Sequence, residues 1–154
     1  MDVVETINQW LAQISTSDAK LKLDDGGCCC LECENGAQCI IEVIPESDRG
    51  YFYSPLVKLP ETKEQQADLL QEVLHLNLFQ LDNTVSSMVL DKRTGYVMLA
   101  RAISIEKMDF GLFQQDLADF IEESIDLQTE LTSVDFSFSS FEQPYTDEPV
   151  ALRV

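Results

Sequence analysis

The stretch that decides the fold begins with Tyr51-Phe52-Tyr53-Ser54-Pro55-Leu56-Val57-Lys58-Leu59-Pro60, an aromatic run that predicts a strand. A Leu-rich helical pattern follows and ends in Leu76-Asn77-Leu78-Phe79. Two more strands, over residues 86–91 and 96–103, flank the turn Lys92-Arg93-Thr94-Gly95. The stretch therefore predicts a strand, a helix and a hairpin, in that order.

Local signals set the limits of this strand and this helix. Pro55 has no backbone N–H, so we expect the strand at a sheet edge or at a bulge. Pro60 ends the strand, and Thr62-Lys63-Glu64-Gln65 has the form of a capping box that starts a helix. The apolar residues of the helix cover a wider arc than one sheet contact buries. We expect part of this arc to pack against a second subunit.

The first 44 residues predict a helix followed by short extended runs. Residues 2–16 form an amphipathic pattern, and residues 20–23, 28–33 and 38–44 read as extended. Asn35-Gly36 between the last two runs favours a two-residue hairpin turn, because both central residues of a type I′ turn need a positive φ. This turn would place Leu31 opposite Ile40 and Cys30 opposite Ile41. Both faces of that hairpin would then be partly apolar.

The last third predicts one long helix and an extension. Asp109 is a suitable N-cap, and a continuous apolar stripe follows it, formed by Phe110, Phe113, Leu117, Phe120, Ile121 and Ile125. We assign residues 1–131 to one domain and residues 132–154 to an acidic, partly disordered C-terminal extension. In that extension Phe136, Phe138 and Phe141 alternate with Ser and Asp, as in a docked extended segment. The whole order, α-β-β-β-α-β-β-α, predicts an α+β fold with a twisted, mainly antiparallel sheet packed by helices.

The composition limits the function. The chain has 154 residues, 45% of them hydrophobic, and 28 acids against 10 bases give a net charge of −18. So negative a chain repels nucleic acid and anionic lipid, which both bind through Lys and Arg. No apolar stretch reaches membrane-spanning length, and Met1-Asp2-Val3-Val4-Glu5 lacks the basic start of an export signal. We expect a cytoplasmic protein with no nucleic-acid partner and no membrane insertion.

The residues that could carry chemistry do not form a convincing site. Cys30 and Cys33 have C-x-x-C spacing, but there is no second pair, and in a strand they would point to opposite faces. His75 is the only histidine, and no P-loop, G-x-G-x-x-G or H-E-x-x-H pattern occurs. We therefore predict no enzyme, metal or cofactor. A zinc or thiol-redox protein built on the cysteines, and an acidic decoy for a basic protein, are rival hypotheses.

The order of elements resembles the class I type III secretion chaperones, the family that includes the Tir chaperone. The resemblance rests on residues 54–60, on Leu69-Leu70 through Phe79, and on Met88-Val89-Leu90-Asp91 through Leu99. It implies a cytoplasmic homodimer that binds the N-terminal region of a secreted effector and keeps it soluble and secretion-competent without ATP. The secretion ATPase is a further candidate partner. The alternative is a regulatory protein-interaction module of the same fold with no secreted client.

The resemblance also implies where partners bind. An effector-binding groove would lie between the first helix and the first strands, formed by Ile7, Trp10, Leu11, Ile14, Leu21, Leu23, Ile40 and Ile44. The dimer interface would lie on the second helix, at Leu69, Leu70, Val73 and Leu74. Ordinary core packing is the alternative for every one of these residues. The chain departs from the family at Asp82-Asn83-Thr84-Val85, where members often have a Gly-rich turn, and in its longer aromatic extension.

Overall fold

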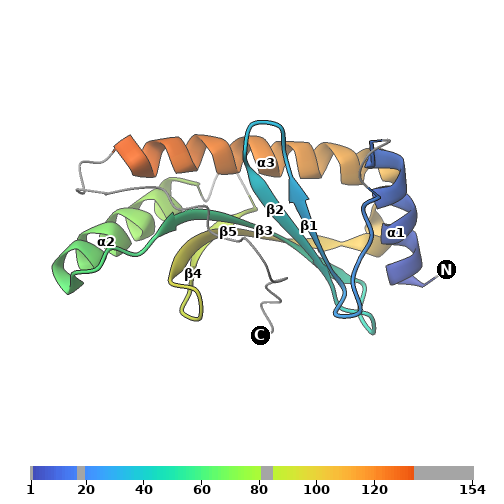
Figure 1. Cartoon of the computed structure of the whole chain (residues 1–154), viewed down its shortest axis with the longest axis horizontal. Coiled ribbons are helices and arrows are strands. Elements are labelled where there is room, and N and C mark those ends of the chain that lie inside the picture. Colours follow the sequence, from blue (N-terminus) through green and yellow to red (C-terminus); the bar gives the residue numbers. More distant parts are fainter. Residues whose placement is uncertain (1, 17–19, 81–84, 134–154) are drawn as a thin grey trace.

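The structure is a computed structural model that describes residues 2–16, 20–80 and 85–133. Its elements follow the predicted order, with one short 3-10 helix added before the last α-helix (Figure 1). They are α1 (Val3–Ile14), β1 (Cys28–Glu32), β2 (Gln38–Val43), β3 (Arg49–Lys58), α2 (Lys63–Gln80), β4 (Ser87–Asp91), β5 (Tyr96–Ser104), η1 (Ile105–Lys107) and α3 (Phe110–Ser133). The predicted α+β order is confirmed. None of the helices in these ranges is long and apolar enough to cross a membrane.

The five strands form one antiparallel sheet in the order β1-β2-β3-β5-β4. Figure 1 shows α3 running along the curved sheet, with α1 near one end of it and α2 near the other. β3 lies in the middle of the sheet, so the prediction of an edge position for its proline is wrong. The alternative, a bulge, is confirmed, because the β3–β5 register shifts between Pro55 and Val57. At the bulge the regular ladder of hydrogen bonds is interrupted, so a residue without a backbone N–H can lie within a central strand.

The β1–β2 hairpin has a different register from the predicted one. Cys30 lies opposite Ile40, and Leu31 lies opposite Cys39. The Cys33 N–H donates to the Ala37 carbonyl at 2.8 Å, and only Gly36 of the two turn residues has a positive φ, +82°. The loop is therefore a three-residue loop with glycine in the left-handed position, not the two-residue type I′ turn. The extra residue shifts every pair by one position.

Residues 20–23 are not a strand, although an extended run was predicted there. Two side chains of the α1 region hold the segment instead. The Leu23 N–H donates to Asn8 Oδ1 at 2.8 Å, and the Leu21 N–H donates to Ser15 Oγ at 2.9 Å. Because helix side chains satisfy these donors, the segment runs beside α1 without joining the sheet.

The sheet buries apolar side chains on both faces. One cluster contains the buried apolar residues of α1, α2 and α3. Phe52 of β3 packs in it against Phe113 and Phe120, with ring centroids 5.8 and 5.6 Å apart. We call this side the helix face. The second cluster lies on the other side and is made only of strand residues. We call it the tyrosine face, formed by Ile40, Tyr51, Tyr53, Tyr96, Met98 and Ala100.

α3 is fixed to the sheet by a buried cation. The Arg101 side chain is 8% exposed and forms ion pairs with Asp116 and, at 2.7 Å, with Glu123 of α3. Its Nε–H donates to Ser86 Oγ at 2.8 Å, and Ser86 donates to the same Glu123 carboxylate at 2.7 Å. The Phe120 ring lies 5.4 Å from the guanidinium carbon. α3 and β5 are thus joined by charge-assisted hydrogen bonds as well as by apolar packing.

The free edge of β4 is tied to α2 by one amide side chain. Asn77 Nδ2–H donates to the Met88 carbonyl at 3.0 Å, and the Met88 N–H donates to Asn77 Oδ1 at 2.8 Å. The side chain thus satisfies both backbone groups of an edge residue, where an unpaired strand invites association.

Replacing Asn77 with alanine should lower the free energy of unfolding by about 1–3 kcal/mol, because a backbone donor and acceptor lose their partners. Urea denaturation followed by circular dichroism measures this loss. Gln71→Ala, at an exposed position of the same helix, is the control. Equal stability of the Asn77→Ala variant and wild type would show that water replaces both bonds without loss.

The domain boundary predicted after residue 131 falls within the last turn of α3, which ends at Ser133. Residues 134–154, for which we predict a partly disordered extension, lie outside the described residues. The predicted N-cap at Asp109 is confirmed, whereas of the predicted capping box the structure shows the bond to the Thr62 hydroxyl, and that hydroxyl itself donates to Gln65 Oε1. The Leu112 N–H donates to Asp109 Oδ1 at 2.8 Å, and the Gln65 N–H donates to Thr62 Oγ1 at 3.3 Å.

Candidate partner-binding surfaces

The α1 residues of the predicted groove are mostly core. Ile7 and Leu11 have no exposed area, and Trp10 is 9% exposed. The Trp10 ring packs on Phe113 of α3, with centroids 5.1 Å apart. These three side chains pack α1 onto the helix face of the sheet, so they are buried in the core and are not available to contact a partner directly.

Of the other predicted groove residues, two lie partly open beside α1. Ile14 and Leu21 are half-buried and pack against the helix-face cluster, whereas Leu23 is 5% exposed. Ile40 belongs to the tyrosine face, on the opposite side of the sheet. Ile44 follows β2 and is 41% exposed. The structure thus brings Ile14 and Leu21 together and places Ile40 on the other side of the sheet.

Close to this pair lies an edge of the sheet. Among the described strands, β1 pairs only with β2, so its other side is an edge. The start of that edge is occupied by the preceding turn, because the Cys28 N–H donates to Asp24 Oδ1 at 2.9 Å and the Asp24 N–H donates to the Cys28 carbonyl at 2.8 Å. The remainder of β1 is placed to accept an added strand from a partner.

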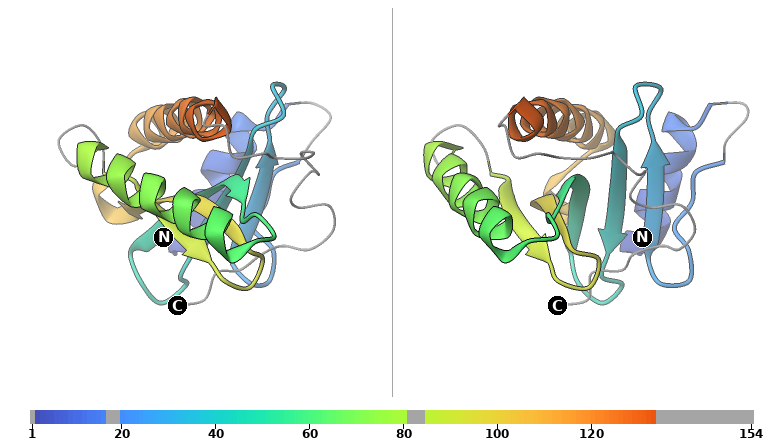
Figure 2. Two further views of the ribbon diagram at one scale, coloured as in Figure 1. Left: turned by 90° about the vertical axis from the view of Figure 1, so that its left-hand side faces the viewer. Right: turned by 60° about the vertical axis from the view of Figure 1, so that its left-hand side comes forward.

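The second apolar surface lies on α2, which sits beside β4 (Figure 2). Leu74, Leu78 and Phe79 are 69%, 63% and 65% exposed. With half-buried Leu70 they form what we call the α2 patch. Its spacing at 70, 74 and 78 places three leucines on one side of the helix. Large apolar side chains this exposed, side by side, mark a contact surface.

The structure divides the predicted dimer residues into two groups. Leu69 and Val73 are 0% and 4% exposed and belong to the helix-face core, whereas Leu70 and Leu74 belong to the α2 patch. Sequence reasoning did not assign Leu78 and Phe79 to any site. The i, i+4 spacing from Leu70 through Leu74 to Leu78 was the signal that could have found the first of them.

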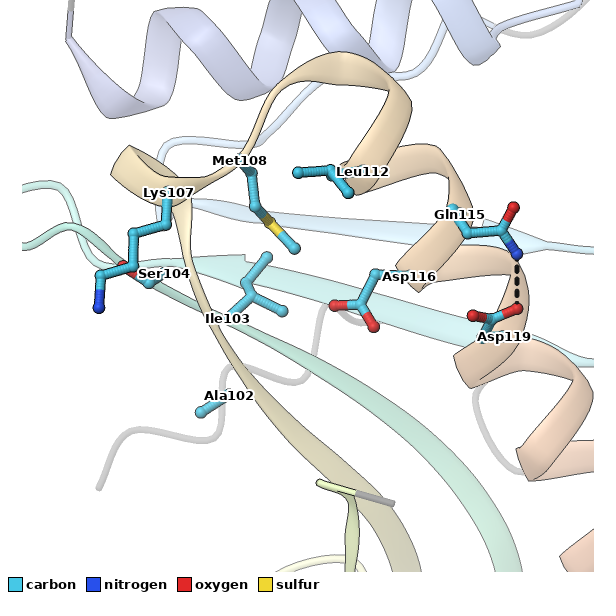
Figure 3. A pocket seen from close by; sticks show the side chains of 9 residues that line it. All are labelled: Ala102, Ile103, Ser104, Lys107, Met108, Leu112, Gln115, Asp116 and Asp119. Carbon is cyan, nitrogen blue, oxygen red and sulfur yellow. Dashed lines mark hydrogen bonds between the residues drawn. The ribbon is translucent and has the colours of Figure 1, made fainter. Parts of the chain in front are cut away.

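A shallow groove between β5, η1 and α3 is the third surface (Figure 3). Ile103, Met108 and Leu112 supply its apolar side chains, while Asp116 and Asp119 supply carboxylates. Gln115 Nε2–H donates to Asp119 Oδ1 at 2.7 Å and so orients that carboxylate. This combination suits one side chain with an apolar stem and a basic end.

Three of the cysteines, Cys28, Cys29 and Cys39, are buried among other side chains, whereas Cys33 is half-buried and Cys30 is exposed. Burial raises the pKa of the Cys29, Cys30, Cys33 and Cys39 thiols, most strongly at fully buried Cys39. A reactive or metal-binding cysteine needs the opposite shift, toward thiolate. Within the described ranges, no three His, Cys, Asp or Glu side chains are placed to hold a metal ion.

Together, a sheet edge beside half-buried apolar residues and an apolar helix patch define a protein that binds other polypeptides. A family model described as the Tir chaperone protein (CesT) family matches residues 5–130. The chain belongs to this family. No curated protein matches the chain in sequence.

Solved structures share the fold. One chain of the ExsC–ExsE complex aligns with a TM-score of 0.71 at 19% identity, over 88% of this chain and 100% of that one. A chain of the HopA1–SchA chaperone–effector complex aligns with a TM-score of 0.64 at 17% identity, over 81% of this chain and 91% of that one. A chain of the heterodimeric ExoU–SpcU complex from the type III secretion system of Pseudomonas aeruginosa aligns with a TM-score of 0.58 at 18% identity. The alignment covers 81% of this chain and 96% of that one. At these identities the likeness establishes a common fold.

Proposed function

We propose that this chain is a type III secretion chaperone. It binds the N-terminal region of an effector protein and keeps that region soluble and ready for secretion, without ATP. The observation that carries the proposal is the family match over residues 5–130, on a chain with the α-β-β-β-α-β-β-α fold. A chaperone–effector complex and a heterodimeric complex of a type III secretion system, each with a chain of this fold, support the same function.

The client would bind in an extended form at the β1 edge. Backbone hydrogen bonds to a strand edge supply sequence-independent affinity, and alternate client side chains can enter apolar sites beside the strand. Ile14 and Leu21 are the partly open side chains there, and buried Ile7, Trp10, Leu11 and Leu23 hold them in place. Ile44 is exposed enough to extend the surface, whereas Ile40 lies on the other face.

The active form would be a homodimer joined through the α2 patch. Leu74, Leu78 and Phe79 expose the apolar area that an interface core needs, and His75 stacks edge-to-face on Phe79 at 4.7 Å. A two-fold interface uses the same patch on both subunits, so an apolar helix face is self-complementary. Each dimer would then carry two client edges.

The remaining parts of the proposal follow from the family and from the charge. The protein would act in the cytoplasm, would have no catalytic activity and would need no cofactor. The secretion ATPase is a candidate docking partner of the loaded dimer. The raised pKa values of the Cys29 and Cys30 thiols support a protein without catalytic activity over the rival zinc or thiol-redox protein, which would need thiolates.

Client binding can be tested with a variant at half-buried Leu21, once circular dichroism has shown that the variant keeps the wild-type fold. Tagged chain incubated with cytosol of its own source should retain one or a few larger proteins through a high-salt wash, each through its own N-terminal fragment. Leu21→Glu should reduce that retention at least tenfold, because it places a carboxylate where apolar side chains bind. Trp10→Glu is unsuitable, since Trp10 packs on Phe113 and its loss would disturb the fold.

The control is Gln13→Glu, which adds the same charge at an exposed position of α1. Retention that is equal in Leu21→Glu and Gln13→Glu would place the client elsewhere. Retention only of basic proteins that wash off with salt would indicate an acidic decoy. Retention of nothing would favour the regulatory module without a secreted client.

A further inference from the structure

β5 extends beyond the strand that lies next to it at the edge of the sheet. It pairs with β3 as far as Ser104, but its pairing with β4 ends where Ser87 lies opposite Ala100. Among the described strands, residues 102–104 of β5 therefore have a neighbour on one side only. We call residues 102–104 the β5 overhang.

The hydrogen-bond ladder shows where the backbone groups of the β5 overhang point. In an antiparallel sheet, successive residues of a strand direct their N–H and carbonyl groups to alternate sides. The Ile105 N–H donates to the Asp48 carbonyl at 2.8 Å, on the β3 side. Ala102 and Ser104 alternate with Ile105, so both direct their backbone groups to the side on which β4 has ended. An edge of this kind can take up a further strand.

The groove between β5, η1 and α3 lies directly beside the β5 overhang, which forms part of its lining (Figure 3). Met108 and Leu112 supply apolar side chains at one end of the groove, and Leu112 is 55% exposed. Asp119 lies at the other end. Alternate side chains of a strand share one face. A segment paired with the β5 overhang would therefore direct every second side chain into this groove.

The two ends of the groove differ in charge. Asp116, between them, is already paired with Arg101. Lys107 lies near Met108, at the apolar end. Asp119 forms no ion pair within the described part of the chain. The Asp119 end therefore suits a basic side chain, whereas the Met108 end suits an uncharged apolar one.

The surface of α3 extends the negative charge beyond the groove. The helix contains six acids and neither Lys nor Arg. Exposed Asp119, Glu122 and Asp126 are spaced three and four residues apart, so they form one row that begins at the groove. This row attracts a basic segment and repels a second copy of the chain, whose net charge is −18. The charge therefore selects a basic polypeptide as the occupant.

We propose that the β5 overhang is a strand-accepting edge that binds a short extended segment of a basic protein. One apolar side chain of the segment would contact Met108 and Leu112, and a Lys or Arg side chain would pair with Asp119. Because η1 follows Ser104 directly, the apolar residue comes first in a segment that runs antiparallel to β5. The inference does not rest on the secretion role, and this edge lies across the sheet from the β1 edge.

A peptide probe tests the proposed edge on the full-length protein. The fluorescein-labelled peptide Thr-Leu-Thr-Arg-Thr-Lys places its Leu, Arg and Lys on one side of an extended chain. Fluorescence polarisation at about 150 mM salt, which partly screens exposed charges, measures its binding. Ala102→Pro should weaken binding at least tenfold, because proline removes the outward N–H of the β5 overhang. Ala102→Ser keeps this N–H and should bind as the wild type does.

A matched variant separates the two edges of the sheet. Cys30 directs its backbone groups outward from β1, since it lies two residues after Cys28, whose N–H donates to the Asp24 side chain. Cys30→Pro should therefore leave the binding of the probe unchanged. Equal losses in Cys30→Pro and Ala102→Pro, or no loss in Ala102→Pro, would overturn the proposal.

A second pair of variants tests the charged end of the groove. Asp119→Asn should weaken binding of the probe at least threefold, because it removes the carboxylate that would pair with the basic side chain. Glu130→Gln removes the same charge from an exposed position near the other end of α3 and should have no effect. Equal binding by both variants would contradict the assigned place of the basic side chain.

Methylation of the probe tests the strand pairing without altering the protein, and it decides the matter if Ala102→Pro does not fold. N-methyl groups on Leu, Arg and Lys, or instead on the three threonines, remove the donors from one edge of the peptide. One methylated probe should lose at least tenfold in affinity and the other should bind like the parent, because one edge alone faces β5. Equal affinity of the two methylated probes would exclude strand pairing.

Two further outcomes would also overturn the proposal. A peptide of the same composition in the order Leu-Lys-Arg-Thr-Thr-Thr that binds as tightly as the probe would show attraction by charge alone. Binding of the probe that weakens as the protein concentration rises would assign the edge to a second copy of the chain.

Discussion

Replacing Arg101 with methionine should lower the free energy of unfolding by about 3–5 kcal/mol, because removing one partner of a buried ion cluster leaves uncompensated charges. The guanidinium is the shared partner of Asp116 and Glu123, and both acids lie on α3. In a chain of net charge −18, a buried base between two acids also relieves repulsion that would otherwise push α3 from the sheet. Urea denaturation of both proteins at neutral pH measures the difference.

The control for Arg101→Met is Arg93→Met, which removes the same charge from an exposed turn and should change stability by less than about 0.5 kcal/mol. Adding Glu123→Gln to Arg101→Met should recover part of the loss, since one buried carboxylate is then neutral. If Arg101→Met were as stable as Arg93→Met, the cluster would contribute nothing net. The apolar contacts of Phe113, Leu117 and Phe120 would then suffice to hold α3.

Replacing Leu74 with glutamate should convert the proposed dimer of twice 17.4 kDa to a monomer. Leu74 is 69% exposed in one subunit, so the variant should fold normally. In the dimer its carboxylate would be buried among Leu78 and Phe79, and the two subunits would bury two such charges. An unpaired buried charge costs several kcal/mol, so the dissociation constant should rise at least about a hundredfold.

Light scattering at micromolar concentration measures the mass, and circular dichroism checks that the variant keeps its helices. Gln13→Glu, exposed on α1 at the other end of the sheet, adds the same charge away from the α2 patch and should remain dimeric. Wild-type protein that is already monomeric would refute the proposed interface. A dimer that survives Leu74→Glu would show that the subunits meet at another surface.

The element order could be predicted because the local signals agreed with the tertiary structure. Asp109 and Thr62 cap α3 and α2 as their sequence positions predict, and the proline in β3 coincides with a bulge. The apolar stripe of α3 was predicted correctly at Phe113, Leu117 and Phe120. The buried row then continues through Ser124, Leu127 and Leu131, whereas predicted Ile125 is only half-buried. These buried positions follow one another at steps of four and three residues and so lie on one side of the helix, and Ile125 lies outside that row.

The candidate site was harder to predict, because apolar spacing shows which side of a helix is buried but not what buries it. Ile7 and Leu69 both read as possible contact residues, and both are fully buried within one subunit. Ile40 was placed with α1, but the hairpin register puts it on the tyrosine face. One additional residue in the β1–β2 loop was enough to shift that register, since side chains alternate from one face to the other along a strand.

The sequence by itself determined the α-β-β-β-α-β-β-α order, the caps and the family resemblance, because these depend on residues that are neighbours along the chain. The tertiary structure alone decided which leucines of α2 form the core and which remain exposed. It also decided that Arg101 joins Ser86, Asp116 and Glu123. Such pairings form between residues far apart in sequence, and they follow from how the sheet curves and where each helix crosses it. No local pattern encodes that geometry.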